Sequence, residues 1–216
     1  MTRLSVLLST LLLTACAANA AILNIGSPNT APDIWTGASI QASATVIYDS
    51  GAKPFSFDGG LTFGQYEEYV ATDTNNTFCA GCLDFALRIS VDPGSTYSIS
   101  TVRFGTWASR TDVGYITGLV GPGAIAPNTV FRGGGNNVGF NFSGLAPGAT
   151  SQIVIVETDA RGMMPGGIFF NDSNNNAQSG TFGSIFVPSP EPSSLTLAGI
   201  ALLVLGGSYL RRRMAR

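Results

Sequence analysis

The segment LDFALRISV, at positions 83–91, alternates between apolar and polar residues with a period of two. This alternation predicts a half-buried β-strand, because successive side chains of a strand point to opposite faces of a sheet. One face would carry the apolar residues Leu83, Phe85, Leu87, Ile89 and Val91, and the other Asp84, Arg88 and Ser90. Comparable short runs predict further strands at 38–48, 61–70, 96–104, 113–120, 137–142, 151–158, 167–171 and 181–187.

Turn-forming residues separate these runs, as in Asp92-Pro93-Gly94-Ser95, and no stretch between residues 21 and 187 has the period of a helix. Many short strands joined by turns predict an all-β fold, namely an antiparallel β-sandwich of the jelly-roll or immunoglobulin-like type. A closed β-barrel is the alternative. The segment 21–187 is long enough to form one domain with its own hydrophobic core.

Residues 1–20 have the pattern of a secretory signal peptide. Arg3 gives a short basic start, an apolar run follows at 4–13, and small residues come next. Ala18-Asn19-Ala20 fits the usual cleavage pattern and predicts cleavage before Ala21. The alternative is that Leu13-Thr14-Ala15-Cys16 acts as a bacterial lipobox, in which Cys16 becomes the lipidated first residue.

Residues 188–216 combine a Pro-rich stalk, an apolar segment and an Arg-rich end. The 16 residues at 195–210 carry no charge. As a helix they would extend about 24 Å, against about 30 Å for the hydrocarbon core of a membrane. Flanking arginines that reach toward the membrane surface close most of this gap. We therefore expect one C-terminal transmembrane helix, with Arg211, Arg212 and Arg213 in the cytoplasm and the domain 21–187 outside it.

The order Pro190-Glu191-Pro192, apolar helix and Arg cluster resembles the PEP-CTERM sorting signal of Gram-negative bacteria that make exopolysaccharide. The resemblance covers residues 188–216 and includes the position of the glycines within the apolar segment. It implies an exosortase-type membrane protease as a partner, with the protein first membrane-anchored and then, after processing, at the cell surface or in the extracellular matrix. Exopolysaccharide is a further candidate partner. The alternative is an ordinary single-pass anchor with a Pro-rich stalk.

The composition excludes several classes of function. The chain contains no histidine, which excludes a Ser-His-Asp triad, a His general base and His-ligated zinc. Residues 21–190 carry 12 Asp and Glu against 6 Lys and Arg, a net charge of −6, so this domain would repel nucleic acid. We therefore expect a non-enzymatic domain with no cofactor, no metal and no nucleic-acid partner.

Paired carboxylates are the remaining route to catalysis, as in glycoside hydrolases. Glu67 and Glu68 are adjacent, so on a strand they would point to opposite faces and could not form such a pair. Glu157 and Asp159 share a face by spacing, but their place at the end of a strand predicts a solvated rim. The sequence therefore predicts no catalytic residues.

Cys79 and Cys82 form a C-x-x-C pair that precedes a predicted strand and lies in an Asn-rich loop. Redox motifs of this type begin a helix, and a four-ligand zinc site would need two more ligands. In an oxidising compartment we expect a disulfide that closes a tight loop, with free thiols as the alternative.

The segment NDSNNN at 171–176 places Asp172, Asn174 and Asn176 in alternation, as at the start of a calcium-binding loop. Gly183 stands where an EF-hand needs its bidentate Glu, so the segment predicts a hairpin turn.

Three functions from different classes fit this sequence. The first is an exported, non-enzymatic surface or matrix protein with a β-sandwich ectodomain. The second is a carbohydrate-binding module that would use the exposed aromatic residues Trp35, Trp107 and Tyr115 as platforms for sugar rings, although buried core positions are the commoner place for Trp. The third is a carboxylate-dependent glycoside hydrolase, which facing carboxylates in a cleft would support.

Overall fold

The computed structural model describes residues 22–24, 26–105, 107, 109–134, 136–174, 177–178 and 184–189. The predicted signal peptide, the Pro190-Glu191-Pro192 motif, the predicted helix at 195–210 and the arginines at 211–213 lie outside the described residues. Within these residues, no helix combines the length and the apolar character needed to cross a membrane.

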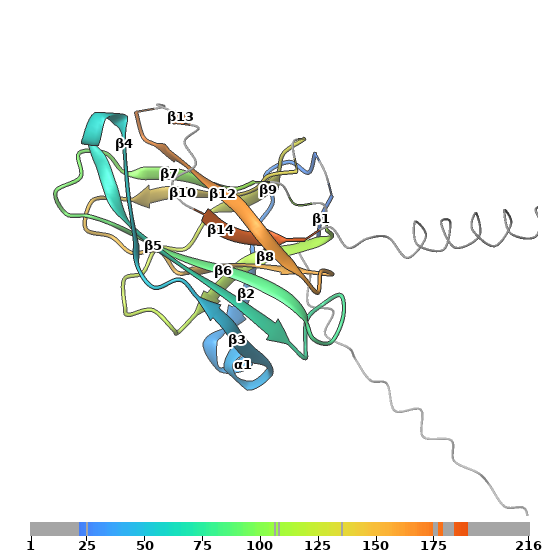
Figure 1. Ribbon diagram of the computed structural model, residues 1–216. Helices are drawn as coiled ribbons and strands as arrows, with labels where there is room; N and C mark the ends of the chain where they lie inside the picture. The colour runs from blue at the N-terminus through green and yellow to red at the C-terminus, as the bar shows by residue number, and fades with distance from the viewer. Residues whose placement is uncertain are drawn as a thin grey trace, which may run out of the picture.

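In the described part of the chain, two β-sheets pack together as a sandwich, with one short α-helix at one side (Figure 1). The larger sheet has the strand order β1-β8-β11-β6-β5-β3, with β2 paired to β8 and β4 paired to β5. Its strands are β1 (Ile22–Leu23), β2 (Asp33–Thr36), β3 (Ala44–Asp49), β4 (Lys53–Phe57), β5 (Thr62–Asp73), β6 (Cys82–Val91), β8 (Thr111–Thr117) and β11 (Ile153–Thr158). A short 3₁₀ helix, η1 (Asp58–Gly60), joins β4 to β5.

The smaller sheet has the order β13-β12-β7-β10-β9, with β14 also paired to β12. Its strands are β7 (Ile99–Phe104), β9 (Thr129–Arg132), β10 (Val138–Leu145), β12 (Met163–Asp172), β13 (Ala177–Gln178) and β14 (Ser184–Pro188). All pairs of named strands are antiparallel except β2 with β8, which is parallel.

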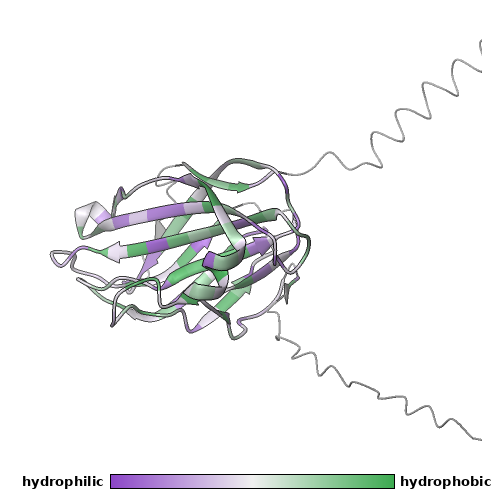
Figure 2. Ribbon diagram, turned by 90° about the horizontal axis from the view of Figure 1, so that it is seen from below, coloured by the Kyte–Doolittle hydropathy of each residue, from purple (hydrophilic) through white to green (hydrophobic). Residues whose placement is uncertain are grey.

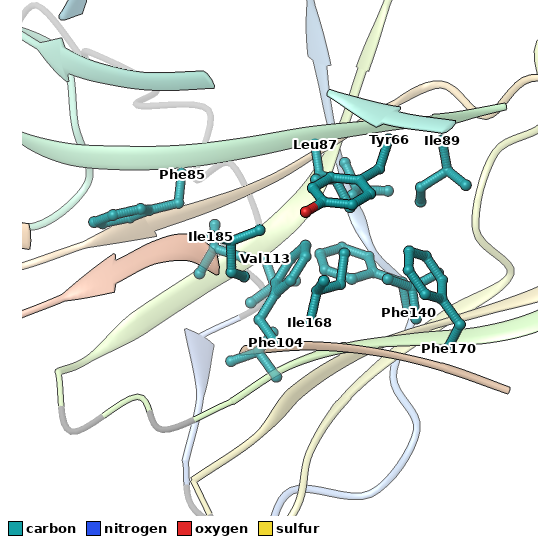
Figure 3. Packing of buried hydrophobic residues seen from close by; sticks show 14 of the residues in the cluster. Tyr66, Phe85, Leu87, Ile89, Phe104, Val113, Phe140, Ile168, Phe170 and Ile185 are labelled. Carbon is teal, nitrogen blue, oxygen red and sulfur yellow. The ribbon is translucent and has the colours of Figure 1, made fainter. Parts of the chain in front are cut away.

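The core lies between the two sheets and is rich in aromatic rings. Polar and apolar bands alternate along the strands (Figure 2), as expected for strands with one face buried. Figure 3 shows side chains of the larger sheet facing those of the smaller one, among them Tyr66, Phe85, Leu87, Ile89, Phe104, Phe140, Ile168 and Phe170. The ring of Phe170 stacks on Phe55 with centroids 4.5 Å apart and also neighbours Phe57 and Tyr66.

The structure confirms the β-sandwich in its broad form, and the strands described here do not close into a barrel. The finer assignment to a jelly-roll or immunoglobulin-like topology stays a prediction. The alternation at 83–91 is confirmed, because Leu83, Phe85, Leu87, Ile89 and Val91 all lie in the core and belong to β6.

The predicted strand at 38–48 is wrong in its first half. Residues 37–43 form the helix α1 (Gly37–Ser43), and the strand β3 begins only at Ala44. Thr36 caps the helix: its hydroxyl oxygen accepts a hydrogen bond from the N–H of Ser39 at 3.2 Å. The strands β2, β4 and β9 were not predicted, since runs of four or five residues show too little alternation.

Candidate functional site

A row of carboxylates crosses the outer face of the larger sheet, the face that points away from the smaller sheet. Glu157 on β11 lies directly opposite Asp84 on β6, and on its other side directly opposite Asp112 on β8. Asp73 ends β5 opposite Cys82, so it lies diagonally across from Asp84. Directly opposite residues have Cβ atoms about 5 Å apart, so register alone brings these acidic side chains together.

Asp73, Asp84 and Glu157, which we call the carboxylate cluster, are all buried. Each offers one carboxylate oxygen, and these three oxygens lie within 4.8 Å of one another. Asp112, beside Glu157, is buried as well. The position of the cluster under a loop, rather than across an open cleft, differs from the two facing carboxylates of a glycoside hydrolase.

The 74–81 loop, between β5 and β6, covers these carboxylates. The side-chain amide of Asn76 donates to Asp84 Oδ1 at 2.7 Å. Thr77 donates twice, from its backbone N–H to Glu157 Oε2 at 3.0 Å and from its hydroxyl to Asp112 Oδ2 at 3.1 Å. The loop therefore holds one oxygen of each of these three carboxylates with neutral donors.

Short-range hydrogen bonds shape the same loop. Asp73 Oδ1 accepts from the N–H of Asn75 at 2.7 Å, which fixes the turn out of β5. Asn76 Oδ1 accepts from the N–H groups of Phe78 and Cys79, at 2.8 and 3.2 Å. Asn76 thus orders the loop with its oxygen and contacts the carboxylate cluster with its nitrogen.

Cys79 and Cys82 lie close together at the end of this loop, with Cα atoms 5.4 Å apart. This separation falls within the range that a disulfide requires. The predicted disulfide would close the loop beside the carboxylate cluster, and it stays a prediction.

The burial of several acidic groups on one face has a clear electrostatic effect. Burial, together with the charge of Glu157, raises the pKa of Asp84 to about 8, although the hydrogen bond from Asn76 opposes this. Burial and the charge of Asp33 raise the pKa of Asp112 to about 7, and burial also raises the pKa of Glu157. The charges of Glu157 and Asp73 disfavour the ionised form of Asp84, and the charge of Glu157 also disfavours that of Asp112, because like charges at short range repel.

Two of these buried oxygens accept no hydrogen bond from any residue that the structure describes. They are Oδ2 of Asp84 and Oδ1 of Asp112. Buried carboxylate oxygens normally have a hydrogen-bond partner or a bound ion. Both atoms therefore mark places where a ligand could bind.

An apolar cavity of about 340 Å³ adjoins the carboxylate cluster on the same outer face. The helix α1 lies at its rim through Ile40 and Gln41, while Ile116 and Ile155 form part of its floor. Asp84 also lines this cavity and connects it with the carboxylate cluster. The volume suits a small molecule.

The acidic residues that lie close together in the sequence do not form carboxylate pairs in the structure. Glu67 and Glu68 point to opposite faces, as predicted: Glu67 pairs with Arg88 on the outer face, and Glu68 is buried in the core. The interpretation of Glu157 as part of a solvated rim is wrong, because it is only 2% exposed. Asp159 lies apart from it and accepts the N–H of Arg110 at 3.0 Å.

The three aromatic residues considered as sugar platforms do not lie on one surface. Trp107 is fully buried and contacts Phe85 and Phe104, so its interpretation as an exposed platform is wrong. Trp35 lies over Gly114 on the outer face, where a β-carbon on residue 114 would be 2.4 Å from the indole ring. Tyr115 follows Gly114 on β8, so its side chain points to the other face of the sheet.

The segment 171–176 forms a turn in its described part. β12 and β13 pair across it, with Asn171 opposite Ala177, which confirms the predicted hairpin. Asp172 is buried, and its two oxygens accept from the hydroxyl of Thr62 and the N–H of Asn174. Asn176 and Gly183 lie outside the described residues.

Comparisons of the chain with protein-family models, with curated proteins and with solved structures found no match. The resemblance of residues 188–216 to a sorting signal therefore stays a prediction, and the functional argument rests on the residues themselves.

The carboxylate cluster was missed in the sequence, where no metal site was expected. Its members come from three strands and are separated by up to 84 positions, so no local spacing connects them. One signal was present: Asp84 stands between Leu83 and Phe85, and Glu157 follows four apolar residues. An acidic residue inside an apolar strand can indicate a buried carboxylate rather than a solvated face.

Proposed function

We propose that this chain is an exported, non-enzymatic surface protein, delivered by a C-terminal sorting signal that an exosortase-type membrane protease processes. The observation that carries the proposal is the order of Pro190-Glu191-Pro192, the apolar segment 195–210 and the Arg cluster at 211–213. The β-sandwich would be the exported part, and the cell surface or an exopolysaccharide matrix its destination.

The place of the motif in the sequence, directly after the last strand of the folded domain, supports this function. β14 pairs with β12 up to Pro188, and the N–H of Ser189 donates to the Gly162 carbonyl at 2.9 Å. Pro190 follows immediately in the sequence. Proline has no N–H and disfavours helical backbone in the residue before it, so the motif is suited to an extended conformation of the kind that proteases bind.

The substitution Glu191→Ala tests the sorting function. A simple anchor depends on apolar length and charge asymmetry, so this change should leave membrane insertion intact. A protease that recognises the carboxylate should lose about 1–3 kcal/mol of binding, which is enough to slow processing strongly. Ser189→Ala, next to the motif, is the matched control.

The readout is the intact mass of the protein from a host that carries exosortase. We expect wild type and Ser189→Ala to be converted to a shorter form without the tail, and Glu191→Ala to keep the tail. If wild type and Glu191→Ala both keep the full tail, the segment is a plain membrane anchor and the proposal fails.

A further inference from the structure

We propose that the carboxylate cluster of Asp73, Asp84 and Glu157 binds a divalent cation, and that Ca²⁺ is the ion that its chemistry favours. This inference concerns the folded β-sandwich and does not depend on the sorting signal.

The geometry of the carboxylate cluster suits a single ion. Ca²⁺ binds oxygen at about 2.3–2.6 Å, so two oxygens on the same ion can lie at most about 5 Å apart. The three carboxylate oxygens lie within 4.8 Å of one another. Three oxygens 4.8 Å apart would each lie about 2.8 Å from a common centre. Side-chain shifts of a few tenths of an ångström, with the strand register unchanged, would therefore bring all three within bonding distance of one ion.

The second observation is the pair of buried oxygens without a partner. Asp84 is 2% exposed, and its Oδ2 accepts no hydrogen bond from the described residues. Asp112 is 1% exposed and lies directly opposite Glu157 on the same face, and its Oδ1 is also without a partner. A buried anionic oxygen is destabilising unless a hydrogen bond or a cation compensates it.

The hydrogen-bond donors around the carboxylate cluster supply no positive charge. The neutral donors to Asp73, Asp84, Glu157 and Asp112 are Asn75, Asn76, Thr77 and the backbone N–H of Val113. These donors orient the carboxylates, and a divalent cation would balance the negative charge of their ionised forms.

The donor set favours Ca²⁺ over other common ions. All three ligands are carboxylates, which suit hard cations, whereas zinc sites in proteins usually include nitrogen or sulfur ligands. Mg²⁺ keeps several waters and demands regular octahedral geometry, which suits a shallow site with one or two carboxylates better than three buried ones. Ca²⁺ accepts irregular coordination by many oxygens, and water could complete its coordination here.

Binding would also fix the 74–81 loop. Asn76 contacts Asp84, and the N–H of Thr77 contacts Glu157, so two loop residues bond directly to ligands. The ion would join β5, β6 and β11 to the loop that covers them. Its expected effect is a Ca²⁺-dependent gain in thermal stability.

The test uses the full-length chain in detergent, treated with EDTA and then dialysed, at pH 7.5. Calorimetric titration with CaCl₂ should give one site per chain, and near-ultraviolet circular dichroism should show a rise in Tm of roughly 5 °C or more at saturating Ca²⁺. MgCl₂ and ZnCl₂ are titrated in parallel.

Asp84→Asn and Glu157→Gln should each weaken Ca²⁺ binding at least tenfold and remove most of the Tm rise. Asp159→Asn is the matched control, because Asp159 lies on the same chain segment as Glu157 and its Oδ1 bond to Arg110 can persist in Asn. This control should bind Ca²⁺ like wild type.

Folding of the variants is measured separately from binding, by their circular dichroism without metal. Replacement of one of these mutually repelling carboxyl groups by a neutral amide should leave the metal-free variants at least as stable as metal-free wild type. The proposal is overturned if folded wild type binds no Ca²⁺ up to millimolar concentration, if Asp84→Asn responds like wild type, or if Mg²⁺ or Zn²⁺ binds more tightly.

Discussion

The two faces of the larger sheet bury acidic side chains in different ways. The inner face packs apolar residues against the smaller sheet and contains Glu68, whose Oε1 accepts the N–H of Phe186 at 2.6 Å. The outer face buries Asp73, Asp84 and Glu157 together under the 74–81 loop. A lone carboxyl group can remain buried by holding its proton, whereas grouped carboxylates need several protons or a cation. The inner face therefore stabilises the fold, and the outer face offers the proposed cation-binding site.

The largest effect is expected from the inner face. Phe170→Ala should lower the free energy of unfolding by about 3–5 kcal/mol, because the ring is fully buried and its loss leaves a cavity. Its contacts with Phe55, Phe57 and Tyr66 would be lost together. Urea denaturation measures the change. Ile34→Ala, at a side chain that is 63% exposed, should change the same quantity by less than about 0.5 kcal/mol. Equal effects of the two substitutions would contradict the described core.

Glu68 gives a second prediction, which concerns pH. Burial raises the pKa of Glu68 from 4.5 to about 7, against the opposing effects of the Phe186 N–H and Lys53. The folded state therefore binds the proton more tightly than the unfolded state, so stability is greatest below about pH 4.5 for this group and falls as pH rises toward 7. The contribution lost is at most about 3 kcal/mol.

Glu68→Gln separates this effect from that of the outer-face carboxylates, because Gln keeps an acceptor for Phe186 and does not titrate. The difference in unfolding free energy between wild type and variant should shift in favour of the variant between pH 5 and pH 8. Denaturant unfolding at both pH values measures it. A difference that is independent of pH would show that Glu68 is ionised in the folded state at both values.

The smallest effect is expected from the cysteines of the outer face. Replacement of Cys79 and Cys82 by Ser should lower stability by about 2 kcal/mol or less, because a disulfide between them would close a very short loop. Thiol titration of the exported protein without reductant should find no reactive thiol at these positions. Two reactive thiols there would exclude the disulfide.

The sequence predicts the strands better than the site, and the reason is physical. Alternation at 83–91 is a local property, so it predicts both β6 and the residues that β6 turns toward the core. The same alternation assigns Asp84 to the other face but does not indicate what covers that face. The 74–81 loop covers that face. Only the pairing of β5, β6 and β11 brings Asp73 and Glu157 next to Asp84. Register between distant strands depends on the whole fold, so the site becomes visible only in three dimensions.

The helix α1 is the reverse case: the sequence contained a local signal for a helix start, and the strand prediction at 38–48 did not use it. Thr36 is of a residue type that favours the N-cap position, yet the run that follows it was included in a predicted strand. Its N-terminal cap and the extended backbone at Ala44 set the bounds of the helix.

The most direct test of the outer-face site is a crystal structure of the protein grown with Ca²⁺ and measured at a wavelength that gives calcium a strong anomalous signal. We predict one anomalous peak bound by carboxylate oxygens of Asp73, Asp84 and Glu157, at about 2.3–2.6 Å from each. The same three carboxylates without an anomalous peak between them, in crystals that contain saturating Ca²⁺, would contradict the account.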